Sequence, residues 1–253
     1  MKLFTIPNIM TLGNLLCGCL GIVFVFEGNL LWASYLIFIA GILDFLDGFV
    51  ARLLNQHSEI GKQLDSLADM VTFGILPSFI IAKLIQISTT QNTVLSDLIP
   101  SNLLSQTHLP TLAYVAFILA LFSCLRLAKF NIDTRQSDSF IGVPTPANAF
   151  VVASFPLILE FNPEYKFLIL NHGSPSATFL IAYTLIMSYL LIAEIPLFAL
   201  KFKNFSWASN QIKYIFLILS VILLVSLKFV AIPLIIFLYV VLSVISNFQA
   251  KKS

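Results

Sequence analysis

The sequence predicts an all-α polytopic membrane protein with about eight transmembrane helices, and three observations lead to this fold class. Hydrophobic residues make up 58% of the 253 residues and charged residues only 10%, whereas a soluble domain has about 25% charged residues. The mean hydropathy is +0.96. Apolar runs close to the ~20 residues needed to cross a bilayer recur along the whole chain. We therefore expect one membrane domain over residues 1–253, without a separate soluble domain.

The apolar runs give the order of the spans. The third is expected to be kinked by Pro77, because proline removes a backbone donor. The last two are expected to share a tight turn at Lys228–Ala231. Six spans within residues 1–200 would form a core, and residues 201–253 would add two C-terminal helices. The expected spans lie at about 8–26, 30–51, 64–86, 110–127, 146–162, 177–200, 212–228 and 231–247.

The lysines and arginines predict the orientation of the chain. Positive residues concentrate on the cytoplasmic side of membrane proteins. With eight spans and both termini in the cytoplasm, three of the 14 cations fall outside, namely Lys83, Lys166 and Lys228. The other eleven fall inside: Lys2, Arg52, Lys62, Arg126, Lys129, Arg135, Lys201, Lys203, Lys213, Lys251 and Lys252. We therefore expect the protein to lie in the inner, or cytoplasmic, membrane of the cell, with both termini in the cytoplasm.

Four aspartates lie close together in one stretch, at Asp44, Asp47, Asp65 and Asp69, although the whole chain has only 12 acidic residues. Intramembrane carboxylates are costly and mark functional sites. The first pair is spaced i, i+3 and the second i, i+4, so each pair shares one helix face. Two facing helices would present four carboxylates to one point, and divalent cations are the simplest compensation. Because Mg²⁺ fills its shell with substrate phosphates, we expect a phosphate or diphosphate substrate and two metal ions.

Small residues beside these aspartates leave room for a ligand near the backbone. They are Gly48, Ala51 and Gly61, and Arg52 follows directly. The pattern Asp44-x2-Asp47-Gly48-x2-Ala51-Arg52-x8-Gly61-x3-Asp65-x3-Asp69 resembles the signature of the CDP-alcohol phosphatidyltransferase family at all eight fixed positions. At roughly 0.05 per residue type, such a match arises by chance in ~10⁻⁸ of chains of this length.

The resemblance implies a function and a role for each residue. The four aspartates would hold Mg²⁺ or Mn²⁺ on the diphosphate of a CDP-lipid, with Ca²⁺ substituting or inhibiting. Asp69 would also be the general base for the incoming hydroxyl. The CDP-lipid would contact Asp44, Gly48, Ala51, Arg52, Gly61 and Asp65. The resemblance further implies a homodimer.

Three further segments resemble the serine-specific branch of the family. They are Asp65-Ser-Leu-Ala-Asp-Met-Val-Thr-Phe-Gly74 followed by Pro77, then Leu125–Asn131, and then Phe140-x-Gly-x-Pro-x-Pro-Ala147. Thr72 and Lys129 stand where that branch has Ser and Arg. This resemblance implies transfer of the phosphatidyl group from CDP-diacylglycerol to the hydroxyl of L-serine.

Arg126, Lys129 and Asn131 end the fourth span on the same membrane face as the aspartates. One interpretation is that the two cations anchor the helix to phospholipid headgroups. The other is that all three bind the serine substrate. A guanidinium suits a carboxylate in bidentate geometry, and an amide both donates and accepts hydrogen bonds.

Two other polar features have open interpretations. Asn8, Thr11 and Asn14 recur on one face of the first span. They would either form hydrogen bonds between helices in lipid or build a polar wall near the substrate headgroup. Glu194 lies near the end of the sixth span before Pro196, where it would pair with Lys201 or with a cation of another helix, or be an interfacial charge.

Two alternatives to the serine transferase remain. The same chemistry could use glycerol 3-phosphate or inositol phosphate, although this face has few basic residues beyond Arg126, Lys129 and Arg135. A cation transporter would need the carboxylates but not the small residues beside them. The formal charge of +2 gives no reason to expect a nucleic-acid partner. The expected partners are CDP-diacylglycerol, L-serine and membrane lipids.

Overall fold

The structure is a computed structural model that describes residues 3–56, 58–91, 109–133, 139–162, 164, 170–171, 174–198 and 207–250. Each of the eight predicted spans contains a helix in this part of the chain. Seven of the cations used to predict the orientation lie outside the described residues: Lys2, Arg135, Lys166, Lys201, Lys203, Lys251 and Lys252.

The first four spans form α1 to α5. They are α1 (Ile6–Phe26), α2 (Leu30–Leu53) and α3 (Glu59–Asp69), which continues through a π-helical segment (Met70–Ile75) into α4 (Leu76–Gln91). A 3-10 helix (Thr111–Phe117) leads into α5 (Ile118–Ile132). The remaining helices are α6 (Thr145–Phe161), α7 (Ala177–Ile192), α8 (Trp207–Leu227) and α9 (Ala231–Ala250).

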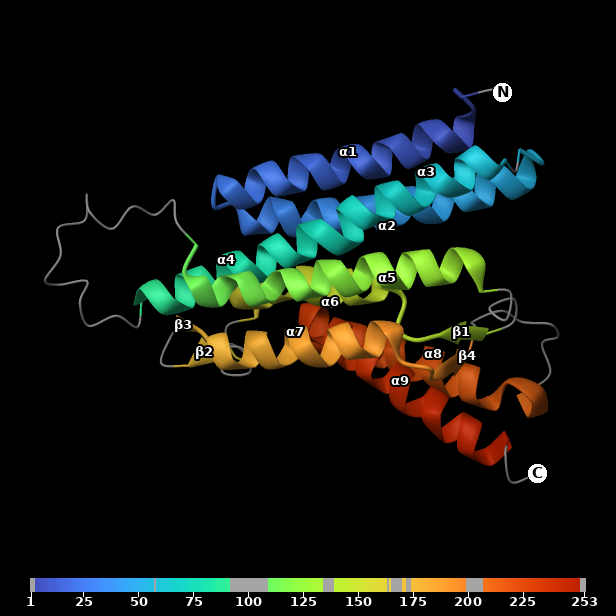
Figure 1. The fold of residues 1–253 in the computed structure, drawn as a ribbon. Coiled ribbons are helices and arrows are strands. Elements are labelled where there is room, and N and C mark those ends of the chain that lie inside the picture. Colours follow the sequence, from blue (N-terminus) through green and yellow to red (C-terminus); the bar gives the residue numbers. More distant parts are fainter. Residues whose placement is uncertain are drawn as a thin grey trace, which may run out of the picture.

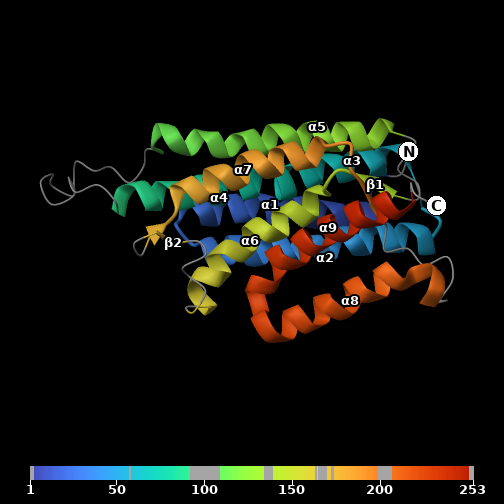
Figure 2. The ribbon, with the colours of Figure 1, turned by 90° about the horizontal axis from the view of Figure 1, so that it is seen from below.

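The helices form one bundle with both chain ends at the same end (Figures 1 and 2). Helix α1 packs on α2, α2 on α6, α5 on α7, and α8 on α9. The interior is apolar and includes Phe73, Leu119 and Phe155. The turn from α2 to α3 lies at the bundle end that holds the termini (Figure 1). The predicted count of eight spans is even and would likewise place both termini on one side of the membrane.

Length and composition identify an integral membrane protein. Four helical stretches of the described residues are long and apolar enough to cross a bilayer: Ile6–Phe26, Glu59–Thr89, Thr111–Ile132 and Asn210–Asn247. Helices α6 and α7 are apolar but shorter, with 17 and 16 residues. The count of eight complete spans stays a prediction.

The sixth span differs from the predicted range of 177–200. Helix α7 ends at Ile192, and Pro196–Phe198 forms strand β4, which pairs antiparallel with β1 (Ser139–Ile141). Pro196 lacks a backbone donor and disfavours helix in the residue before it. Glu194 therefore lies after the helix, not inside a span. A second small sheet pairs β2 (Leu170–Asn171) with β3 (Ser174–Pro175), and these two short pairs are the strands found among the described residues.

The sheet formed by β1 and β4 joins three helices. The amide of Gly142 donates to the Ile195 carbonyl at 2.9 Å, next to the start of α6. Gly142 has φ +77°, and a Cβ there would lie 2.5 Å from the Leu191 carbonyl oxygen. Helix α9 binds the other strand, because the Tyr239 hydroxyl donates to the Phe198 carbonyl at 2.8 Å. The start of α6, the end of α7 and the middle of α9 are thus connected at the bundle end that holds the termini (Figure 1).

Two local predictions concern a tight turn and a helix kink. The expected tight turn at Lys228–Ala231 is present as a 3-10 turn over Lys228–Val230, where Lys228 has φ +50°. At the predicted Pro77 kink, the π-helical segment Met70–Ile75 ends two residues before the proline. Such segments re-pair backbone groups around a missing donor.

Candidate active site

A capped hairpin between α2 and α3 brings the two aspartate pairs together. Asn55 adopts a left-handed backbone with φ +51° after the end of α2, and the Gln56 amide donates to the Ala51 carbonyl at 2.9 Å. These contacts terminate the helix as a left-handed C-cap does. Ser58 then caps α3 by accepting a hydrogen bond from the Gly61 amide at 3.1 Å. The chain reverses within a few residues, so the C-terminal turns of α2 face the start of α3.

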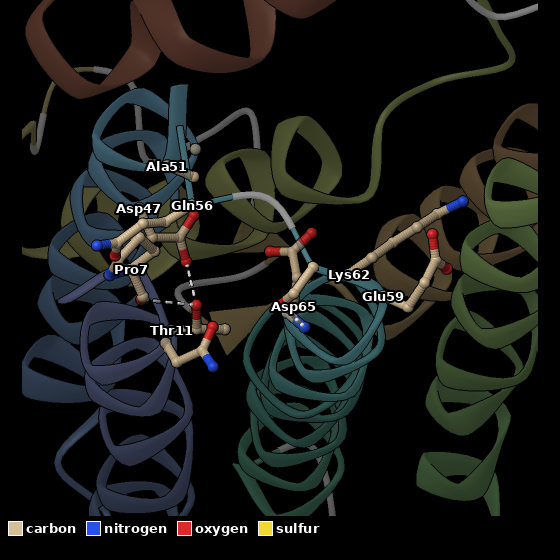
Figure 3. A pocket seen from close by; sticks show the side chains of 12 residues that line it. Pro7, Thr11, Asp47, Ala51, Gln56, Glu59, Lys62 and Asp65 are labelled. Atoms are coloured by element: carbon tan, nitrogen blue, oxygen red, sulfur yellow. Dashed lines mark hydrogen bonds between the residues drawn. The ribbon is translucent and has the colours of Figure 1, made fainter. Parts of the chain in front are cut away.

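Three of the four aspartates converge as predicted. Asp44, Asp47 and Asp65 each offer a carboxylate oxygen, and these atoms all lie within 4.8 Å of one another. Figure 3 shows Asp47 and Asp65 pointing toward each other from α2 and α3. Hard carboxylate oxygens at this separation are a donor set that fits Mg²⁺, Mn²⁺ or Ca²⁺.

Asp69 lies one helical turn deeper than Asp65 and outside this group of three. Its side chain is 8% exposed, and it is near enough to be repelled by Asp44, Asp65 and Asp47. The Asn14 amide donates to its Oδ1 atom at 3.1 Å. Asp69 is therefore the buried member of the cluster and the one held by a neutral donor.

A cavity of about 540 Å³ opens beside the three convergent aspartates, and two of them, Asp47 and Asp65, line it. Its walls come from the start of α1, the end of α2 and the start of α3. The lining residues are Pro7, Asn8, Thr11, Asp47, Gly48, Ala51, Gln56, Ser58, Glu59, Gly61, Lys62 and Asp65.

The predicted small residues lie in this wall, and one of them is not explained by packing. A Cβ on Gly48 would meet no atom within 4 Å, so no neighbouring helix requires a glycine there. Gly61 is different, because a Cβ there would lie 3.1 Å from Ser58 Oγ and 3.2 Å from Asn8 Oδ1. Arg52 is exposed at the end of α2 and is not one of the residues that line the cavity.

Helix α1 supplies hydrogen bonds to the aspartates. The Thr11 hydroxyl donates to Asp47 Oδ2 at 2.6 Å, as Figure 3 shows. Asn14 holds Asp69, as described above. Asn8 lines the cavity and donates from its side-chain amide to the Leu3 carbonyl at 2.8 Å. The polar face predicted for the first span therefore lies against the carboxylates, and two of its members bond them directly.

The three predicted serine-binding residues have different surroundings at the end of α5. Arg126 is 3% exposed, and its Nε atom has no hydrogen-bond partner among the described residues. Its guanidinium lies over the Phe130 ring, 5.2 Å from the centroid. Lys129 forms an ion pair with Glu194, which is the pairing with a cation of another helix that the sequence left open.

Asn131 joins α5 to α3. Its side-chain amide donates to Ser66 Oγ at 2.8 Å, and its carbonyl accepts from Lys62 Nζ at 2.9 Å. Ser66 directly follows Asp65, so these bonds fix the end of α5 beside the aspartate helix.

Four polar residues of the cavity wall were not predicted from the sequence, namely Gln56, Ser58, Glu59 and Lys62. They lie in the α2–α3 connection and the first turn of α3, where polar residues are common for reasons of solubility and capping. Lys62 was counted only as an orienting charge. Their polarity alone carries no signal of a ligand.

The fold and site together define an integral membrane protein with a carboxylate cluster suited to divalent cations and an open cavity beside it. The chain belongs to the CDP-alcohol phosphatidyltransferase family, whose model matches residues 4–245. This family uses divalent metals, in agreement with the donor set described above.

Similar curated proteins carry a more specific name. A CDP-diacylglycerol–serine O-phosphatidyltransferase from Helicobacter pylori is 29% identical over 228 residues, which cover 89% of this chain and 83% of the relative. The protein of that name from Bacillus subtilis is 35% identical over 164 residues, 62% of this chain and 77% of the relative. An archaetidylserine synthase from Methanothermobacter thermautotrophicus is 30% identical over 155 residues, 60% of this chain and 58% of the relative.

Proposed function

We propose that this protein transfers the phosphatidyl group of CDP-diacylglycerol to the hydroxyl of L-serine, giving phosphatidylserine and CMP. The observation that carries the proposal is the group of three carboxylates within 4.8 Å beside an open cavity, in a member of the CDP-alcohol phosphatidyltransferase family. The similarity to serine transferases from H. pylori and B. subtilis supports serine as the acceptor.

Asp44, Asp47, Asp65 and Asp69 would hold two ions of Mg²⁺ or Mn²⁺, and Ca²⁺ would substitute for them or inhibit. When bound, the ions neutralise the diphosphate and the departing CMP. The protein's own contribution is to fix the carboxylates. Asp47 is bonded by Thr11 and Asp69 by Asn14, so two of the four are oriented before any ion binds.

The cavity between α1, α2 and α3 is the proposed site of the CDP-lipid. Gly48 borders open space, and Ala51 and Gly61 complete a wall of small residues. A nucleotide can therefore approach the backbone of α2 without meeting a side chain. Exposed Arg52 is close enough in sequence to bind a phosphate of the nucleotide or a carboxylate of the cluster.

Asp69 is the proposed general base. A serine hydroxyl is a poor nucleophile at neutral pH and needs a positioned base. In the reaction, Asp69 takes the hydroxyl proton, the serine oxygen attacks the phosphorus that carries the diacylglycerol, and the bond from that phosphorus to the bridging oxygen breaks. CMP leaves with the electron pair of that bond. Asn14 donates to Oδ1, so Oδ2 is the oxygen left to accept the proton.

Arg126 is the proposed ligand of the serine carboxylate. Burial with an unpartnered Nε is expensive for a guanidinium unless a ligand completes its hydrogen bonds. Lys129 and Asn131 remain predicted serine ligands. In the structure both have protein partners, so bound serine would share or replace the contacts with Glu194 and Ser66.

The proposed setting follows from the charge distribution. The site lies at the bundle end that holds both termini (Figure 1), and the excess of Lys and Arg predicts that this end faces the cytoplasm. We therefore propose an active site at the cytoplasmic face of the inner membrane, in one membrane domain that forms a homodimer. Its core would be residues 1–200, with the two C-terminal helices added to it.

The test is transferase activity of the purified protein in detergent with CDP-diacylglycerol, Mn²⁺ or Mg²⁺ and labelled L-serine, next to the Asp69→Asn variant. Labelled phosphatidylserine from the wild type and none from the variant is the expected result. Product formed with glycerol 3-phosphate or inositol phosphate instead would remove the acceptor assignment and keep the aspartate site.

A second measurement separates the transferase from a cation transporter. CDP or CMP should protect the protein against heat, and only in the presence of Mg²⁺ or Mn²⁺, because a ligand that binds the folded state stabilises it. Absence of product with all three acceptors, together with metal binding but no protection by nucleotide, would favour the transporter.

A further inference from the structure

Helix α1 carries none of the four aspartates, yet two of its side chains bond two of them. Thr11 is 3% exposed and donates to Asp47 Oδ2 at 2.6 Å. Asn14 is fully buried and donates to Asp69 Oδ1 at 3.1 Å. Both bonds cross between segments that lie 36 and 55 residues apart in the chain. They are therefore tertiary contacts, not local capping.

Close packing fixes α1 against the aspartate helix at this level. A Cβ on Gly18 would lie 2.4 Å from Thr72 Oγ1 and 3.0 Å from Thr72 Cα, so α1 approaches the π-helical segment closely only because residue 18 is glycine. The Thr72 hydroxyl donates to the Asn14 carbonyl at 3.1 Å. Helix α1 consequently cannot slide or rotate without breaking these contacts, and its two donors have defined positions.

The chemistry of the two side chains suggests more than packing. The Thr11 hydroxyl also lies 3.0 Å from the Pro7 carbonyl in its own helix, which would satisfy it without Asp47. Asn14 leaves its Oδ1 atom buried with no partner among the described residues. In a membrane helix an apolar residue would avoid that cost, so the donors are not needed for burial itself.

We propose that Thr11 and Asn14 are positioning residues that give two of the four aspartates different roles, an inference that rests on the proposed function. Thr11 occupies Oδ2 of Asp47 and presents Oδ1 to a divalent ion. Asn14 occupies Oδ1 of Asp69 and presents Oδ2 to the acceptor hydroxyl. Loss of Thr11 should therefore change metal binding, and loss of Asn14 should change the chemical step.

The first arm of the test measures Mn²⁺ binding to the purified protein in detergent without substrate, from the electron paramagnetic resonance signal of free Mn²⁺. The nearly isosteric Thr11→Val should weaken Mn²⁺ affinity by about 10- to 100-fold, as loss of other hydrogen bonds to metal ligands does. Thr11→Ser should restore most of it. The matched control is Thr184→Val in α7, where a buried threonine donates to its own helix, to the Leu180 carbonyl at 2.8 Å.

The second arm measures kinetics with CDP-diacylglycerol and serine. Asn14→Leu should lower kcat by about tenfold or more, a part of the ~10²–10⁴-fold that a positioned base contributes, with the KM for CDP-diacylglycerol within twofold of the wild type. A purely structural role would instead lower the melting temperature and change kcat and KM together. Asn14→Ser, which keeps a donor in a smaller side chain, should retain more kcat than Asn14→Leu.

The outcomes separate this inference from the proposed function. Asp47→Asn should abolish Mn²⁺ binding, and if it does not, the metal site itself is wrong. If Asp47→Asn abolishes binding while Thr11→Val and Thr11→Ala both bind Mn²⁺ like the wild type, only the inference about Thr11 is overturned. If the Thr11→Val variant does not fold, Thr11→Ala takes its place in this comparison. Unchanged kcat in Asn14→Leu overturns the inference about Asn14.

Discussion

Replacing Gly48 by alanine should raise the melting temperature of the protein and, at the same time, weaken its binding of CDP-diacylglycerol. Gly48 lies inside α2, and a Cβ there would meet nothing within 4 Å. Alanine is favoured over glycine in a helix interior by about 1 kcal/mol. In a protein of this size, that corresponds to a rise of about 2–4 °C in melting temperature.

The effect on activity should have the opposite sign. Gly48 lines the cavity beside Asp47, so the added methyl group would occupy space that we assign to the CDP-lipid. Forcing a methyl group into a filled site costs about 1–3 kcal/mol. At about 1.4 kcal/mol per tenfold, the KM for CDP-diacylglycerol should rise about 5- to 150-fold.

The matched control is Gly41→Ala in the same helix. A Cβ on Gly41 would lie 2.4 Å from Cζ of Phe150, and that ring is held by stacking on Phe38 with centroids 5.4 Å apart. This variant should melt at a lower temperature than the wild type and keep its KM. Thermal unfolding and initial rates over a series of CDP-diacylglycerol concentrations measure both effects. A KM within twofold of the wild type for Gly48→Ala would refute the assignment of the cavity.

Three other changes have defined outcomes. Arg126→Lys should raise the KM for serine by about tenfold or more at saturating CDP-diacylglycerol, because lysine lacks the bidentate fork, and an unchanged KM would contradict the assignment. Gly142→Ala should lower stability by at least about 1–2 kcal/mol, since φ is +77° and a Cβ would lie 2.5 Å from a carbonyl oxygen of α7. Its control is Gly28→Ala, at φ +80° with open space around it, which should melt at a higher temperature than Gly142→Ala. Equal losses of stability in the two variants would show that the contact with the carbonyl oxygen of α7 does not contribute. Glu194→Gln should lower the free energy of unfolding by less than about 1 kcal/mol, because the ion pair with Lys129 is exposed. A larger loss, measured by denaturant unfolding, would contradict this prediction.

Hydropathy predicted the helices because a bilayer imposes both their length and their apolar composition. The range 177–200 was too long for a reason that hydropathy does not contain. The residues after Ile192 are as apolar as a helix requires, but their backbone pairs with Ser139–Ile141. That pairing depends on a distant glycine and on α9, and neither is visible in a local window.

The aspartate cluster was predictable because helical spacing and the cost of buried charge act on the same residues. The convergence of Asp44, Asp47 and Asp65 agrees with that argument. The sequence placed Thr11 and Asn14 on one face but left open what that face contacts, because the contact depends on how α1 packs against α2 and the π-helical segment. The polar cavity wall in the α2–α3 connection carried no pattern at all.

The π-helical segment sets the rotation of the aspartates relative to the rest of their span. A π turn holds one residue more than an α turn, and one residue corresponds to a rotation of about 100° around a helix axis. Met70–Ile75 lies directly between Asp69 and α4. Deleting one residue there would allow a regular α-helix and would turn Asp65 and Asp69 about a quarter of the circumference away from α2. The length of these six residues is therefore as much a part of the motif as the spacing between its aspartates.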